Sequence, residues 1–182
     1  MPQSKFQKMM YAFITVVITV HAFVFYSLYV VNGNTFLQLQ PDASGVLDAI
    51  GKMGGVYMCG RFCPIWAVVL LEFVLAYTLE CVAGSPLSFK IACKIFNPQK
   101  DHHVLFETAI ICATVFIMCP AMSFIASFLY YPYYEGFNIF TLLAEWLKLV
   151  CYNLPFALFS QIFFIQPLVH RIFGFCFRKK IS

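Results

Sequence analysis

The chain has 182 residues, of which 62% are hydrophobic and only 11% are charged. An ordinary soluble domain carries roughly 25% charged residues, and a surface this apolar would aggregate in water. The composition therefore argues against a soluble fold and predicts an all-α, polytopic membrane protein. The net charge of +4 does not indicate nucleic-acid binding, because the basic residues gather beside apolar stretches and form no basic helix.

Four stretches are long and apolar enough to cross a bilayer core of ~30 Å, which takes about 20 helical residues. The first follows Lys5 and Lys8 but lacks the short apolar core and small-residue cleavage site of a signal peptide, so we expect it to be retained as a helix. In chain order, the predicted spans are residues 9–31, 62–84, 104–131 and 147–169.

The predicted loops differ in length. The loop at 32–60 is rich in glycine and polar residues, and Val46, Leu47, Ile50 and Met53 have helical spacing within it, which predicts a short interfacial helix. The loop at 132–144 is short. Amphipathic rings that suit a membrane interface gather near this side, at Tyr29, Tyr130, Tyr131, Tyr133, Tyr134 and Trp146.

The distribution of basic residues predicts the orientation. Lysine and arginine are retained on the cytoplasmic side during insertion, and most of the 12 basic residues flank the other ends of the spans. We therefore expect a cell (inner or plasma) membrane protein with both termini and the middle loop in the cytoplasm. These basic residues are Lys5, Lys8, Lys90, Lys94, Lys100, Arg171, Arg178, Lys179 and Lys180.

The two halves of the chain are similar. Residues 85–91 (SPLSFKI) align with 166–172 (QPLVHRI) at an offset of 167 − 86 = 81, and the same offset places Glu72 beside Asn153 and Glu80 beside Gln161. The first and third spans align at an offset of 101, as in Tyr29 and Tyr130. The pattern predicts two parallel two-helix hairpins, residues 1–98 with the outer loop 32–60 and residues 99–182, related by a pseudo-twofold axis along the membrane normal.

Three short motifs carry a resemblance to a known family: Met122-Ser123-Phe124, the tryptophans Trp66 and Trp146 that open the second and fourth spans, and Pro167-Leu168-Val169-His170-Arg171. These features resemble DUF2798, a bacterial domain of unknown function in which one copy is a single two-helix hairpin. The second half is the closer match. The resemblance implies a tandem duplication of that domain, and it implies no known activity.

Ionisable groups at the bilayer centre cost roughly 2.5 to 3.5 kcal/mol, so each needs a reason. At 1.5 Å per residue, His21 and Glu72 lie at similar depth, and we expect both to face the bundle interior. Met122 with Ser123 in the third span and Asn153 in the fourth lie within about two turns of that level. The sequence therefore predicts a midplane ligand or proton site formed by His21, Glu72, Met122, Ser123 and Asn153.

Two functions remain open at this point. The first is transport or binding of a small molecule or ion through this polar site. The second is a structural or accessory subunit that packs laterally on itself or on a larger membrane protein, with Glu72 bonded to His21 or Asn153 only to fix helix register. A metal site is disfavoured because no tight ligand spacing occurs. No enzyme motif is present, so we expect no catalytic residues and no cofactor, and the lipid bilayer is the expected surroundings.

Outside the midplane, we expect Asp101 to cap the third span. Glu80 and Glu107 should pair with nearby lysines at the inner boundary. Cys59 and Cys63, read as one helical turn apart, are expected to be unpaired thiols, because that spacing does not favour a disulfide.

Overall fold

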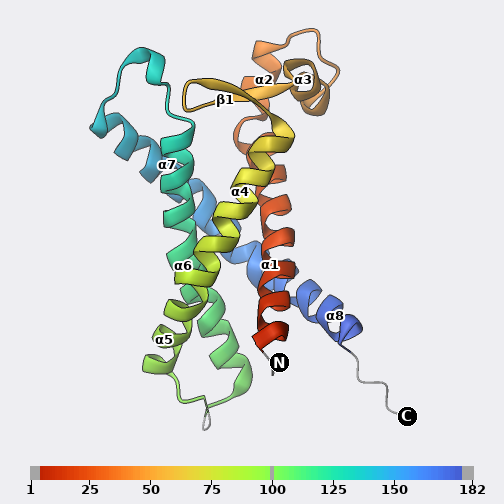
Figure 1. The fold of residues 1–182 in the computed structure, drawn as a ribbon, viewed down its shortest axis with the longest axis vertical. Coiled ribbons are helices and arrows are strands. Elements are labelled where there is room, and N and C mark those ends of the chain that lie inside the picture. The colour runs from red at the N-terminus through yellow and green to blue at the C-terminus, as the bar shows by residue number, and fades with distance from the viewer. Residues whose placement is uncertain (1–4, 99–100, 178–182) are drawn as a thin grey trace.

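The computed structural model describes residues 5–98 and 101–177. Within them, four helices are long and apolar enough to cross a membrane. The helices alternate in direction, so the start of the first, the turn between the second and third, and the end of the fourth lie at one end of the molecule (Figure 1). We call this the basic end, because its helices carry Lys5, Lys8, Lys90, Lys94 and Arg171.

The spans divide into the following elements. The first is α1 (Lys5–Tyr26) with a π-helical turn, η1 (Ser27–Val31). The second is α4 (Ile65–Leu79), the π-helical η2 (Glu80–Gly84) and α5 (Ser85–Ile95). The third is α6 (His103–Leu129). The fourth is α7 (Ile139–Ser160), the π-helical η4 (Gln161–Ile165) and α8 (Gln166–Cys176).

The prediction of four spans is confirmed, and the first and third lie within two residues of their predicted limits. The second and fourth helices are longer than predicted, because they run to Ile95 and from Ile139 to Cys176. An apolar length criterion detects only the part of a helix that lies in hydrocarbon, and the extensions after the predicted second and fourth spans contain lysine, histidine or arginine. Residues 139–144 are mostly apolar and were wrongly assigned to the loop. Residues 62–64 were wrongly included in the second span, since they form a strand.

The end opposite the basic end holds the long loop. It contains α2 (Gly33–Leu39), α3 (Val46–Met53) and an antiparallel hairpin of β1 (Gly55–Met58) and β2 (Arg61–Pro64). The short helix predicted from the spacing of Val46 to Met53 is confirmed as α3. The hairpin was not predicted. Its two turn residues, Cys59 and Gly60, have φ of 50° and 74°, as a type I′ turn requires.

Neighbouring spans pack in two pairs, α1 with α4 and α6 with α7, and the pairs meet at the basic end, where α5 packs on α6 and α8 packs on α1. The buried core is small: one cluster is Val16, Val20 and Ala76, and another is Val115, Cys119 and Ala157. Only 11% to 22% of the most apolar window of each span is buried. The remaining apolar surface is what a helix exposes to lipid.

The second and fourth helices each widen at one π-helical turn. In both turns, a backbone N–H donates to the carbonyl oxygen five residues earlier. The Ser85 N–H donates to the Glu80 carbonyl, and the Gln166 N–H donates to the Gln161 carbonyl. In both, the next residue is a proline, Pro86 or Pro167, which has no N–H to donate. Turns of this kind are frequent at functional sites, and here both adjoin the space between the helix pairs.

Candidate functional site

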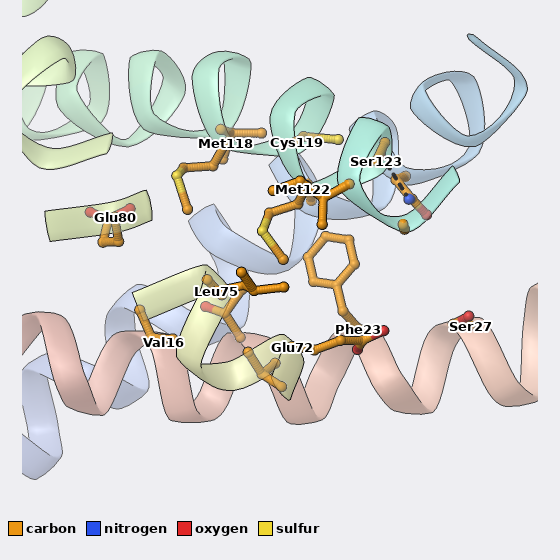
Figure 2. Close-up of a pocket in the computed structure, with 18 of the residues that line it drawn as sticks. Val16, Phe23, Ser27, Glu72, Leu75, Glu80, Met118, Cys119, Met122 and Ser123 are labelled. Atoms are coloured by element: carbon orange, nitrogen blue, oxygen red, sulfur yellow. Dashed lines mark hydrogen bonds between the residues drawn. The ribbon is translucent and has the colours of Figure 1, made fainter. Parts of the chain in front are cut away.

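A cavity of about 1370 Å³ lies between the four spans. Its walls are mostly apolar, and its polar groups lie at several depths along it. Ligand pockets usually measure about 300 to 1,000 Å³, so this space is large enough for a drug-sized molecule. Figure 2 shows Met118, Cys119 and Met122 of α6 across the cavity from Leu75 and Phe23.

Four of the five predicted site residues line this one cavity: Glu72, Met122, Ser123 and Asn153. Ser123 is only 2% exposed and accepts a hydrogen bond from Asn153 Nδ2 at 3.1 Å, drawn as the dashed line in Figure 2. Met122 packs against the cluster of Val16, Val20 and Ala76. The structure therefore brings polar and thioether groups from three spans into one space.

Glu72 accepts a hydrogen bond from the Tyr130 hydroxyl at 2.5 Å. The expectation that its partner would be His21 or Asn153 is therefore wrong. Tyr130 was predicted only as a membrane-interface tyrosine. It lies just beyond the end of α6, so this bond connects the first helix pair to the second. The one sequence signal for Tyr130 is its alignment with Tyr29 at the offset of 101. That alignment does not predict which face of the helix Tyr130 lies on or which residue it contacts.

His21 does not belong to the site, contrary to the sequence-based prediction. Its side chain is exposed and does not line the cavity. Its Nδ1 lies 2.7 Å from the Val17 carbonyl oxygen, one turn earlier in the same helix. Counting residues gives depth but not direction. The backbone carbonyl supplies the hydrogen bond that the prediction had assigned to a neighbouring helix, so the imidazole needs no interhelical partner.

Glu80 is a cavity residue that the sequence analysis assigned elsewhere. Its carboxylate accepts a hydrogen bond from Ser85 Oγ at 2.7 Å and lines the cavity. A Cβ atom at Gly84 would collide with this carboxylate, so the glycine makes room for it. The predicted pairing with a lysine is not found for the described residues Lys90 and Lys94.

The inner carboxylate Glu107 also differs from the prediction. It pairs with the ring of His103, with Nδ1 and Oε2 3.5 Å apart, because one helical turn separates the two residues in α6. Lys100, the other predicted partner, lies outside the described residues. The cap of α6 is His102, and Asp101 accepts the Asn97 N–H at 2.5 Å instead, so the predicted capping role of Asp101 is wrong.

Two amide side chains connect α1 to the fourth helix. Gln161 Nε2 donates to Thr19 Oγ1 at 2.9 Å, and Gln166 Oε1 accepts from the Tyr11 hydroxyl at 2.6 Å. All four residues line the cavity. These hydrogen bonds between neutral groups join the two helix pairs beside the cavity.

The hairpin at the opposite end also joins the helix pairs. Its turn residue Cys59 donates its N–H to the Leu129 carbonyl at 2.7 Å, at the end of α6. Cys59 and Cys63 are both free thiols. Cys63 lies in β2 and Cys59 lies in the hairpin turn, so the prediction that the two residues are one helical turn apart is wrong.

The second helix pair is the part of the chain that is similar to a known family. Residues 103–177 match the family model of DUF2798. The match covers α6, α7 and α8 and confirms the resemblance inferred from the second half. DUF2798 is described as a domain of unknown function, so it supplies no activity. Ser123 and Asn153 lie inside the matched residues, whereas Glu72 and Glu80 lie outside them.

No curated protein and no solved structure matches the chain.

Proposed function

We propose that this protein is a multi-pass membrane protein that binds a small molecule in the cavity between its two helix pairs and moves it across the bilayer. The observation that carries the proposal is the cavity of about 1370 Å³ with Glu72, Glu80, Ser123 and Asn153 in its walls. Carboxylates within membrane spans are costly, and they commonly mark substrate or proton pathways. Mostly apolar walls with a few convergent polar groups are typical of ligand sites.

The proposal includes an internal duplication, in which residues 1–98 and 99–182 are two parallel hairpin repeats. Support comes from the π-helical turns, which begin at Glu80 and Gln161, an offset of 161 − 80 = 81. Each turn is followed by an α-helix of 11 residues. The packing is also reciprocal, since α5 of the first hairpin packs on α6 of the second, and α8 of the second packs on α1 of the first. Substrate sites of transporters often lie between such repeats.

The proposed orientation places the basic end in the cytoplasm of a bacterial cell, with the protein in its plasma membrane. Lys90 and Lys94 in α5, Arg171 in α8 and the start of α1 lie together at this end (Figure 1). Retention of lysine and arginine on the cytoplasmic side supports this direction. The site would then open by movement of one helix pair against the other about the pseudo-twofold axis.

Saturable photolabelling tests the proposed function. A neutral aryl diazirine is activated on the purified protein in lipid nanodiscs, with and without excess unlabelled probe, and the modified residues are identified by mass spectrometry. We expect labelling of Met118, Met122 and Cys119 to be competed by the excess probe. Labelling of the exposed residues Phe159 and Phe163 should not be competed, because lipid-facing positions do not saturate.

A matched pair of variants sharpens this test. Ala126 lines the cavity, so Ala126→Trp should fill it and abolish the saturable labelling. Ala144 is exposed and does not line the cavity, so Ala144→Trp should label as the wild type does. Labelling that cannot be competed at any cavity residue would disprove the proposal.

A second candidate function is that of an accessory subunit that packs laterally on itself or on a larger membrane protein. It is favoured by the exposed ring cluster of Phe159, Phe163 and Phe164, which are 56%, 64% and 61% exposed. Tight packing of rings is a common contact between membrane helices. A stable monomer after extraction in native nanodiscs, with no partner that co-purifies, would count against this candidate.

A further inference from the structure

The cavity is acidic although the chain is basic. The chain has a net charge of +4, yet the described residues that line the cavity include four glutamates and neither lysine nor arginine. These glutamates are Glu72, Glu80, Glu107 and Glu145. The sign of the charge in the cavity is therefore opposite to that of the molecule, and it favours a positively charged occupant.

The four glutamates differ in their partners. Glu145 pairs with Lys148 at 3.3 Å, and Glu107 pairs with His103 at 3.5 Å. Among the described residues, Glu72 and Glu80 form no ion pair and accept hydrogen bonds only from the hydroxyls of Tyr130 and Ser85. An ionised carboxylate at this depth is unfavourable without a counter-charge. These two therefore each hold either a proton or a cation.

Glu72 and Glu80 have a geometry that suits one elongated or bulky ligand. With Ala76 between them, they form an i, i+4, i+8 stripe along the second helix, which spaces them by about 12 Å. Rings and thioethers line the same cavity as the stripe: Phe23 belongs to α1, and Met118 and Met122 project from α6 on the facing side (Figure 2). The Met118 sulfur and the Glu80 carboxylate both lie next to Gly84. Aromatic faces and polarisable sulfur both stabilise a hydrophobic cation.

We propose that the ligand of this cavity is a hydrophobic organic cation, an aromatic amine or quaternary ammonium or phosphonium compound, held by the Glu72 and Glu80 carboxylates. The inference rests on the proposed function and narrows its substrate class. An anion would be repelled by the same groups, and a neutral molecule would leave the two carboxylates without use. A small metal ion is disfavoured, because the described residues contain no cluster of three His, Cys, Asp or Glu side chains.

Binding of such a cation exchanges it for a proton. When a monovalent cation binds beside a protonated carboxyl, that carboxyl releases one proton, so the charge in the membrane does not change. The other titratable groups in the cavity walls are Tyr11, Tyr130, Tyr131, Cys119, Glu107, Glu145 and His170. Of these, histidine is the type that ordinarily titrates near neutral pH, so His170 needs its own control.

A pair of probes with the same shape and opposite charge tests the proposal. Equilibrium dialysis measures binding of tetraphenylphosphonium and of tetraphenylborate to the protein in nanodiscs, with empty nanodiscs subtracted. We expect saturable binding of the phosphonium and none of the borate. Glu72→Gln and Glu80→Gln should each weaken phosphonium binding at least about tenfold. The matched control is Asp48→Asn, which removes an acid whose side chain is exposed and does not line the cavity, and this variant should bind as the wild type does.

Two further measurements exclude a merely structural effect of these variants. Tyr130→Phe keeps the Glu72 carboxylate and removes its hydroxyl partner, so phosphonium binding should be retained. Phosphonium binding should also weaken as the pH falls, because protons compete with the cation for the carboxylates. His170→Gln should leave this pH profile in place, and the Glu72→Gln, Glu80→Gln double variant should abolish it.

The outcomes separate this inference from the proposed function. Equal binding of the borate and the phosphonium, or phosphonium binding that survives the double variant, would overturn the cation proposal. If the neutral diazirine labels the cavity saturably while the phosphonium fails to bind, the cavity remains a ligand site and only its substrate class is wrong. If neither probe binds, both proposals fall.

Discussion

The two long helices that border the cavity carry matching polar residues with different chemistry. At the offset of 81, the acids Glu72 and Glu80 of the second helix correspond to the amides Asn153 and Gln161 of the fourth. The amides donate to hydroxyls on other helices, Asn153 to Ser123 and Gln161 to Thr19. The acids accept hydrogen bonds from hydroxyls, Glu72 from Tyr130 and Glu80 from Ser85. Under the proposed function, the amides of the fourth helix serve mainly in packing, while the acids of the second helix present charge to the ligand.

The largest effect should come from moving an acid into the amide half. Asn153→Asp would place a carboxylate beside Ser123 and remove the amide N–H that donates to the Ser123 hydroxyl. A charge at this depth should lower the free energy of unfolding by roughly 2.5 to 3.5 kcal/mol. Glu72→Asn makes the reverse exchange and should leave stability unchanged or raise it. Unfolding in mixed micelles measures both free energies. Equal destabilisation by the two variants would show that the halves do not differ in this way.

Loss of the amides themselves should cost less. Asn153→Ala and Gln161→Ala each remove one interhelical hydrogen bond, and such bonds contribute about 0.6 kcal/mol in membrane proteins, with a maximum of about 1.7. We expect lower stability in the same unfolding measurement and unchanged phosphonium affinity. Glu72→Gln and Glu80→Gln should show the opposite pattern. A large loss of affinity in Asn153→Ala would assign the amide to the ligand site.

Gly84 tests how the acidic half makes room for its charge. The corresponding residue of the other half is Ile165, which is 2% exposed, so only the acidic half needs a residue without a Cβ here. Gly84→Ala should move the Glu80 carboxylate and weaken phosphonium binding severalfold, because the new Cβ collides with it. Ordinarily alanine is the better helix former by about 1 kcal/mol, so stability should fall little. Gly174→Ala, at an open position near the end of α8, is the control.

The sequence predicts the helices of this protein better than their faces. The apolar stretches define four spans because the bilayer demands long helices whatever the side-chain detail. Helix ends were missed where polar residues extend a helix beyond the apolar stretch, as at residues 85–95, and the start at Ile139 was missed because its apolar residues were assigned to the loop. The hairpin at Cys59 was missed because its strands are only four residues each, too short for a pattern of alternation.

The candidate site was predicted in part for a related reason. Depth follows from counting along the chain, and Glu72, Met122, Ser123 and Asn153, which were predicted to lie near one level, line the same cavity. Direction depends on how the helices rotate against one another, and this failed for His21. Glu80 was predicted to pair with a lysine, because its short distance along the chain from the basic residues indicated a position at the membrane interface. The π-helical turn and Gly84, which hold it in the cavity, have no signature that the sequence analysis used.

The smallest predicted effect lies outside the membrane and contrasts with both cavity acids. Asp48 in α3 accepts the Ser44 N–H at 2.8 Å and pairs with Lys52 at 3.1 Å. These donors, the Ser44 backbone first, hold the pKa of Asp48 below its ordinary value of 3.8. A lowered pKa means that this stabilisation is present above pH 3.8 and is lost as the pH falls through the folded-state value.

Carbonyl NMR of the full chain labelled at aspartate measures this titration in nanodiscs. Lys52→Ala should raise the pKa of Asp48 only in part, because the Ser44 N–H remains. Ser44→Pro, which removes that N–H, should raise it further. If Lys52→Ala alone restored the ordinary value, the ion pair and not the backbone donor would hold the charge. Because Asp48 is exposed at the protein surface, its carboxylate is stabilised by local donors. Glu72 and Glu80 each accept a hydrogen bond from one hydroxyl but lack a counter-charge among the described residues, and under the cation proposal the ligand supplies that counter-charge.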